Sequence, residues 1–146
     1  MVTVIKPPDP IILPQGSKSI FLAGSIDQGK AEDWQTRMIN ACQDVHEPTE
    51  NIIILNPRRD DWNDGWVQRM ENPYFREQVE WELDGMERAT QIIMYLVAGT
   101  KSPISLLELG LAAGKYPWKI SVYCEPGFWR EGNVEILCKR YGIYQH

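Results

Sequence analysis

Histidine, cysteine and surplus positive charge are all scarce in this sequence of 146 residues. It contains two histidines and three cysteines, none at the spacing of metal ligands, so we predict no metal site. The odd number of thiols (Cys42, Cys124 and Cys138) indicates reduced side chains, as is usual in the cytoplasm. The net charge of −5 argues against a general nucleic-acid-binding protein, because such a protein needs a basic surface.

Long apolar runs are also missing. No segment is apolar over the length that spans a bilayer, and the first residues lack the charged-then-apolar pattern of a secretion signal. We therefore expect a cytoplasmic protein with no membrane association. What the sequence does contain is an ordinary globular composition, with 43% hydrophobic and 24% charged residues, in a chain long enough to bury one core.

Strand and helix patterns alternate after a proline-rich start. Residues 1–17 hold four prolines and predict an extended arm, whereas residues 18–146 predict a single domain. Apolar strands separated by helices indicate an α/β fold, a flavodoxin-like doubly wound three-layer sandwich with a mainly parallel five-stranded sheet. Strands are expected at 18–23, 51–55, 91–97, 119–124 and near 143, and helices at 31–45, 73–89, 103–114 and 132–141.

Unusual polar residues gather where three of these strands end, in residues 24–27, 56–60 and 99–102. In doubly wound sheets, ligands bind outside the carboxyl ends of the strands. The three segments are therefore expected to form a binding site.

A glutamate lies within an apolar helix in residues 99–114. Ser102 is a suitable N-cap, and the helix is apolar nearly all round, so we expect it to be buried. Glu108 falls in the same arc as Ile104, Leu111 and Ala112, where a carboxylate loses solvation and either has a raised pKa or takes a partner. Two interpretations follow: a structural glutamate bonded to a donor, or a catalytic carboxylate that faces a cleft. We favour the second.

Two cofactor-binding patterns are incomplete. Residues 24–31 match the phosphate-loop spacing G-x-x-x-x-G-K, but Ala31 stands where magnesium needs a Ser or Thr hydroxyl. Neither of the next two strands ends in the aspartate of a nucleotide triphosphatase. No Ser/Thr-rich loop for a flavin phosphate follows the first strand either. We therefore predict no phosphate loop and no cofactor.

Asp84, in the helix expected at 73–89, is the second carboxylate of interest. If this helix and the Glu108 helix flank neighbouring strands, both carboxylates face one cleft. The alternative for Asp84 is an exposed pair with Arg88, one helical turn on. The loop at 58–61 has a similar pair of interpretations, because its two arginines either pair with its two aspartates or contact a ligand oxygen.

Together these residues resemble the nucleoside 2-deoxyribosyltransferase family and its relatives, from about Ser19 to Val122. The Glu-Leu-Gly at 108–110 is the most specific match, because the family places its nucleophile in such a motif. The other matching segments are 20–25, 56–58, 81–84, 92–95 and 102–107.

The resemblance implies an enzyme that cleaves or transfers the N-glycosidic bond of (deoxy)nucleosides. Glu108 would be the nucleophile of a covalent glycosyl–enzyme ester, and Asp84 would lie near the substrate. The implied partners are a nucleoside or nucleotide and a free nucleobase, and the implied assembly is a homo-oligomer of at least two chains. The expected substrate-binding residues are Gly24, Ser25, Asn56, Arg58, Asp60, Trp62 and Ser102.

Departures from the family pattern leave alternatives open. Well-studied transferases carry an aspartate where this chain has Ser102, and a tyrosine roughly where it has Ile20. A serine in that loop is closer to the deoxynucleoside 5′-monophosphate N-glycosidases, which are hydrolases, and Arg58, Arg59 or Lys101 would then hold the 5′-phosphate. A non-catalytic nucleotide-binding or sensing domain on the same fold is the other alternative.

Overall fold

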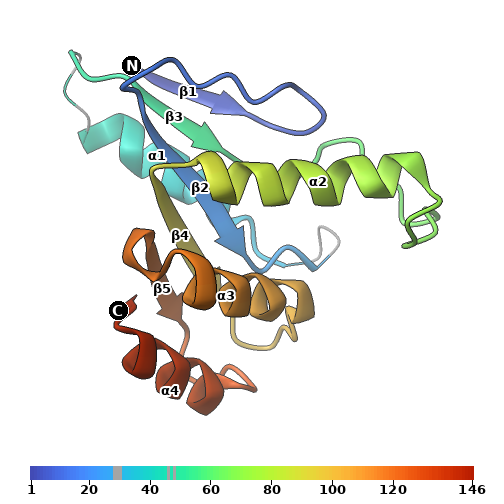
Figure 1. Ribbon diagram of the computed structural model, residues 1–146, viewed down its shortest axis with the longest axis vertical. Helices are drawn as coiled ribbons and strands as arrows, with labels where there is room; N and C mark the ends of the chain where they lie inside the picture. Colours follow the sequence, from blue (N-terminus) through green and yellow to red (C-terminus); the bar gives the residue numbers. More distant parts are fainter. Residues whose placement is uncertain (28–30, 46, 48) are drawn as a thin grey trace. The chain divides into compact units, whose positions relative to one another are not determined.

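The computed structural model of this chain describes residues 1–27, 31–45, 47 and 49–146. Figure 1 follows the chain from its N-terminus to its C-terminus. The second glycine and the lysine of the phosphate-loop spacing, Gly29 and Lys30, lie outside the described residues. In chain order the elements are β1 (Val2–Ile5), β2 (Lys18–Gly24), α1 (Trp34–Val45), β3 (Ile52–Leu55), α2 (Pro73–Arg88), β4 (Gln91–Leu96), α3 (Pro103–Lys115), the short 3-10 helix η2 (Pro117–Lys119), β5 (Ile120–Cys124), α4 (Glu131–Tyr141) and β6 (Tyr144–Gln145).

The described strands form a sheet in the order β1-β3-β2-β4-β5-β6. Strands pair in parallel wherever their register is described, as apolar strands joined by helical crossovers should. The predicted α/β fold with a mainly parallel sheet is confirmed. The strand number differs, because this sheet has six strands and the sequence pattern predicts five.

The additional strand, β1, lies in the segment that the sequence predicts to be an extended arm. Val2–Ile5 pairs in parallel with Ile52–Leu55 and so adds a strand at the edge of the sheet. The prolines of the arm begin only at Pro7, which leaves the β1 amides available for pairing. Beyond β1 the arm is bound to α2, since Trp81 Nε1 donates to the Asp9 carbonyl at 2.8 Å.

The chain forms two compact units, and each unit combines two separate segments of the sequence. Unit 1 comprises Met1–Phe21 and Gln35–Thr90, and unit 2 comprises Leu22–Trp34 and Gln91–His146. β2 therefore begins in unit 1, where it pairs with β3, and ends in unit 2. The predicted site residues are divided between the units, and each unit is described by itself below.

In unit 1, α1 and α2 lie on opposite faces of the strands (Figure 1). Asn72 begins α2 by accepting the Tyr74 amide at 3.1 Å, and Pro73 occupies the first turn, where its missing N–H costs nothing. Gly85 allows α2 to approach β2, because a Cβ there would lie 2.7 Å from the Phe21 ring.

In unit 2, the end of β2 lies directly against β4. A Cβ at Gly24 would be 2.1 Å from the Tyr95 carbonyl oxygen, and φ at this glycine is +128°, so no larger residue fits. The next residue, Ser25, donates its amide to the same carbonyl at 2.9 Å. α3 and α4 pack against each other along this part of the chain (Figure 1).

Most element boundaries lie within two residues of the prediction, with one exception. The helix expected to begin at residue 31 begins at Trp34 instead. The Ala31 amide donates to the Ile26 carbonyl at 3.1 Å, a contact outside the helix.

Candidate active site

Three hydroxyl groups meet in unit 2 where β2 and β4 end. Ser25 Oγ lies 2.6 Å from Ser102 Oγ and 3.0 Å from Thr100 Oγ1, and the last two atoms are 2.8 Å apart. The Val97 amide donates to Ser25 Oγ at 2.9 Å, and Thr100 Oγ1 donates to the Val97 carbonyl at 2.8 Å. We call Ser25, Thr100 and Ser102 the hydroxyl cluster. It joins the end of β2 to the 97–102 loop.

Ser102 precedes the first turn of α3, as predicted, but it does not cap the helix with its side chain. Its backbone is left-handed, with φ +47° and ψ +52°, and its hydroxyl is turned into the hydroxyl cluster. The helix begins through the backbone instead, since the Leu106 amide donates to the Ser102 carbonyl at 3.1 Å. The expected side-chain cap is therefore wrong, because the cluster competes for the same hydroxyl.

Glu108 lies on the buried side of α3, at 9% exposure, with Ser105 and Leu109 as buried neighbours on the same helix. The other side of α3 is apolar and open to solvent, since Ile104 is 57% and Leu107 is 70% exposed. The expectation that α3 is buried all round is therefore wrong. The arc that Glu108 shares with Ile104, Leu111 and Ala112 is buried only in part, because Ala112 is fully buried and Leu111 is 38% exposed.

A second set of contacts holds the 97–102 loop from the side of β5. Glu125 follows β5 and accepts the Tyr95 hydroxyl at 2.6 Å with one carboxylate oxygen. Its other oxygen accepts the Ala98 amide at 2.8 Å. Trp129 Nε1 donates to the Lys101 carbonyl at 2.8 Å. The loop before α3 is therefore fixed by side chains from β2 and from the segment after β5.

In unit 1, the residues after β3 are held mainly by contacts within their own loop. Asn56 is buried and accepts the Arg58 amide at 3.0 Å with its side-chain oxygen. Asp60 pairs with Lys6 at 2.7 Å. Arg59 bonds Asp61 at 2.6 Å and Glu77 at 3.2 Å, and this pairing holds the pKa of the Asp61 carboxyl below its usual range. The first of the two interpretations of this loop, pairing with its own acids, therefore describes Arg59.

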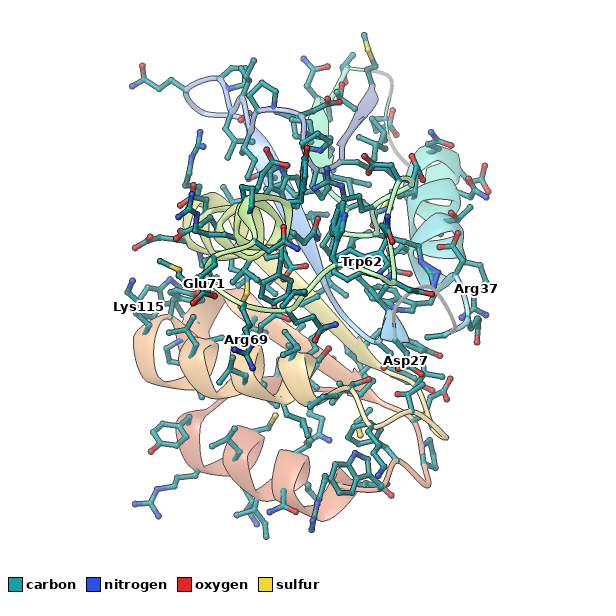
Figure 2. The ribbon with its side chains drawn as sticks, turned by 90° about the vertical axis from the view of Figure 1, so that its right-hand side faces the viewer. Asp27, Arg37, Trp62, Arg69, Glu71 and Lys115 are labelled. Atoms are coloured by element: carbon teal, nitrogen blue, oxygen red, sulfur yellow. The ribbon has the colours of Figure 1, made fainter. Side chains whose placement is uncertain are left out.

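Trp62 belongs to a cluster of aromatic rings in the segment that joins β3 to α2 (Figure 2). The centre of its ring lies 5.1 Å from that of Trp66. The Trp66 ring stacks on Tyr74, with 5.5 Å between the ring centres, and the Arg59 guanidinium lies over the Trp66 ring at 4.9 Å from its centre. The Trp62 indole N–H is buried and has no hydrogen-bond partner within the described part of the chain. It remains able to donate to a ligand.

The carboxyl group with unusual chemistry in unit 1 is Glu82, and sequence reasoning missed it. Burial raises its pKa to about 7. The hydrogen bond from Gln78 favours the charged form and so lowers the pKa, but its effect is smaller than that of burial. Gln78 Nε2 donates to Glu82 at 2.8 Å and to the Pro57 carbonyl at 3.0 Å, which connects α2 to the loop after β3. Asp84, the residue selected from the sequence, is exposed.

A sequence signal for Glu82 does exist. Gln78, Gly85 and Met86 are buried residues of α2 that lie four, three and four positions from Glu82. The spacing of apolar residues along the sequence predicts a stripe of Phe75, Val79, Leu83 and Met86 on this helix; Met86 is fully buried, but Leu83 is 40% exposed. The buried side of α2 therefore differs from the side that the apolar spacing predicts, because the small Gly85 and the large Trp81 pack on Phe21.

The predicted site residues divide as follows. The structure brings Ser25 and Ser102 together in unit 2, and Asn56 and Arg58 together in unit 1. Asp60 bonds Lys6, which is not among the predicted residues. Unit 2 holds Gly24, Ser25, Ser102 and Glu108, and unit 1 holds Asn56, Arg58, Asp60, Trp62 and Asp84.

The described residues contain neither a metal-binding group of side chains nor a membrane-spanning helix. No group of three or more His, Cys, Asp or Glu side chains in residues 1–27, 31–45, 47 and 49–146 is arranged to hold a metal ion. In the same residues, no helix combines the length and the apolar character that crossing a membrane requires.

Comparison with known proteins gives one family. The sequence model of the family described as "nucleoside 2-deoxyribosyltransferase like" matches residues 17–128. This range contains the hydroxyl cluster, Glu82 and Glu108. No curated protein matches the chain.

Proposed function

Because the chain belongs to the nucleoside 2-deoxyribosyltransferase-like family, we propose that it cleaves or exchanges the N-glycosidic bond of a (deoxy)nucleoside or nucleotide. The observation that carries this proposal is Glu108, a carboxylate on the buried side of α3. It follows a loop that side chains hold from both sides. A nucleophile fixed in this way loses little freedom when the substrate binds.

In the proposed reaction, a Glu108 oxygen attacks the anomeric carbon while the bond from that carbon to the base nitrogen breaks. The bonding electron pair leaves with the base, which takes up a proton, and the sugar becomes an ester of Glu108. A second base or a water molecule then attacks the anomeric carbon. The ester bond breaks, Glu108 returns as a carboxylate, and the acceptor loses a proton. Transfer and hydrolysis differ only in this acceptor.

The departing base needs a proton donor, and unit 1 offers two candidates, Glu82 and Asp84. An acid works best when its pKa lies near the working pH, and burial raises the pKa of Glu82 to about 7. Asp84, which the family resemblance suggested, is the competing candidate, and its exposure on α2 counts against it. The variants E82Q and D84N separate the two, because only loss of the true acid abolishes the falling limb of the pH–rate profile.

We further propose that Gly24, Asn56, Arg58, Asp60 and Trp62 line the substrate site. The buried Trp62 N–H supports this for the 58–66 segment, since it is a donor without a partner among the described residues. If the substrate carries a 5′-phosphate, Arg58, Arg59 or Lys101 is the expected cation.

We propose a homo-oligomer of at least two chains. The support is the outer side of α3, where Ile104, Leu107 and Leu111 form an exposed apolar stripe at helical spacing. A Cβ at Gly110 or Gly114 on the same helix would meet no atom within 4 Å, so the surface beside the stripe is open. A second copy would bury the stripe.

The test is chromatography of the purified protein after incubation with 2′-deoxyinosine and free adenine, and separately with deoxynucleoside 5′-monophosphates. Glu108→Ala is the inactive variant, and Glu135→Ala, at an exposed position of α4, is the matched control. Deoxyadenosine formed by the wild type and the control, but not by the Glu108 variant, establishes a transferase.

Free base from the monophosphates alone, again dependent on Glu108, establishes the hydrolase. If neither product forms while a nucleotide still raises the melting temperature, the enzyme proposal is wrong. The chain is then a nucleotide sensor.

A further inference from the structure

Ser25 is completely buried, and each of its polar atoms is engaged within unit 2. Its amide donates to the Tyr95 carbonyl at 2.9 Å, and its own carbonyl accepts the Trp34 indole N–H at 2.9 Å. Its hydroxyl meets Thr100, Ser102 and the Val97 amide. A side chain so fully used within the fold has no donor left for a ligand.

The other two hydroxyls of the cluster are in the same position. Thr100 donates to the Val97 carbonyl at 2.8 Å, and the remaining hydroxyl protons have oxygen acceptors within the triangle at 2.6 to 3.0 Å. Ser102 is also largely buried, at 7% exposure. The cluster is thus satisfied internally, which is how buried polar groups avoid a desolvation penalty.

The cluster determines where α3 begins. Ser102 has a left-handed backbone (φ +47°), a conformation that non-glycine residues adopt only when their surroundings hold them in it. Its hydroxyl contacts hold it here, and its carbonyl accepts the first helical hydrogen bond, from Leu106. A change in the cluster would therefore move or loosen the first turn of the helix.

Glu108 lies six residues beyond Ser102 on the same helix, about 9 Å along its axis. A helix transmits a shift of its first turn to the residues of the next, because its backbone hydrogen bonds make it stiff. A displacement of about 1 Å at a reacting atom can lower a rate by about a hundredfold.

We propose that Ser25 is a positioning residue for Glu108, acting through the hydroxyl cluster that fixes the start of α3. This rests on the proposed function, in which Glu108 is the nucleophile. It also reassigns two residues that sequence reasoning placed against the substrate, because Ser25 and Ser102 act here through the helix.

The test uses variants that differ only in the hydroxyl. Thr100→Val keeps the shape of the side chain and removes the hydroxyl, whereas Thr100→Ser keeps the hydroxyl. Ser25→Ala removes the central group, and Ser102→Gly removes the hydroxyl while accepting the left-handed backbone. Val134→Ala, in the buried core of α4, is a control that lowers stability without touching the cluster.

We expect Ser25→Ala and Thr100→Val to lower kcat by about tenfold to a hundredfold with KM nearly unchanged, well below their melting temperatures. The loss should be equal for a nucleoside and its 5′-monophosphate, and Thr100→Ser should stay close to the wild type. A rise in KM for the monophosphate alone would show that the hydroxyls bind phosphate, and the proposal would be wrong. The same kcat loss in Val134→Ala would reduce the effect to general destabilisation.

A second readout needs no activity. Amide hydrogen exchange at Val97 and Leu106 should become faster in Ser25→Ala and Thr100→Val than in Val134→Ala. Unchanged exchange at both amides overturns the positioning role even if the enzyme is active. If the wild type shows no turnover that depends on Glu108, the proposed function fails. The exchange data then still decide whether Ser25 fixes the start of α3.

Discussion

At the scale of single residues, the proposed reaction draws attention to two carboxyl groups that lie in buried surroundings. Glu108 is buried in unit 2, and Glu82 is held inward in unit 1 by Gln78. The ion pairs Lys6–Asp60 and Lys18–Glu50, by contrast, are largely exposed to solvent, where such pairs add little to stability. The two glutamates are therefore the residues whose replacement should be most informative.

Glu108→Gln should lower turnover by more than about a thousandfold, because an amide oxygen is a poor nucleophile toward the anomeric carbon. The melting temperature should stay the same or rise, because the substitution removes a buried charge without changing the shape of the side chain. Steady-state kinetics and a thermal melt measure the two effects. Retained turnover would exclude Glu108 as the nucleophile, and a large fall in melting temperature would indicate a structural glutamate instead.

Glu82→Gln should change how stability depends on pH. The pKa of this carboxyl rises from 4.5 to about 7 on folding, so the folded state binds the proton more tightly than the unfolded state. Protonation stabilises the protein at low pH, and this stabilisation is lost as the pH rises from about 4.5 to about 7. The variant should therefore gain stability over the wild type at pH 8, by up to about 3 kcal/mol, and little at pH 4. Urea titrations at the two pH values measure the difference, and an equal gain at both would contradict it.

The sequence singles out Glu108, Asp84 and the segments at the strand ends, and the structure adds Glu82, whose pKa is raised by burial. A periodicity argument ranks apolar residues, and in α2 it follows Val79 and Leu83. The buried side is set instead by Gly85, whose missing side chain lets Phe21 approach. Such a contact between distant parts of the chain is not visible in the spacing of apolar residues along one helix.

At the scale of elements, the helices and the central strands can be predicted from the sequence pattern, but the edge strand β1 cannot. The four central strands lie where apolar runs predict them, because a parallel strand covered on both faces needs such a run. β1 escapes prediction because Val2–Ile5 is short and stands beside a proline-rich arm. Only its pairing with Ile52–Leu55 defines it as a strand.

Two glycines should respond in opposite ways to the same substitution. Gly24→Ala should destabilise the protein by about 3 kcal/mol or more, because its Cβ would lie 2.1 Å from the Tyr95 carbonyl oxygen. Gly110→Ala lies within α3 where a Cβ meets no atom within 4 Å, so it should stabilise by about 0.5–1 kcal/mol. Equilibrium unfolding in urea measures both. Loss of stability in the second variant would mean that another surface covers α3 at that position.

At the scale of the whole molecule, the outer side of α3 predicts self-association. Leu107→Lys places a charge at the centre of the exposed stripe and should shift the protein toward the monomer at a given concentration. Sedimentation velocity over a hundredfold range of concentration, about 1 to 100 μM, measures the equilibrium in a range typical of moderate affinities. A wild type that sediments as a monomer throughout would contradict the proposed assembly. Equal association of both proteins would place the interface elsewhere.

The way in which the chain passes between its two units has a genetic consequence. It crosses from one to the other after Phe21, after Trp34 and after Thr90, so neither unit corresponds to a continuous stretch of the gene. A fragment that starts at Gln91 would lack Gly24 and Ser25, which contact the backbone of Tyr95. A single recombination event therefore cannot replace unit 2 with that of a relative, because its β2 end and its β4 would then descend from different parents. Exchange of the whole of unit 2 requires that the 22–34 segment and the region from residue 91 onward be exchanged together.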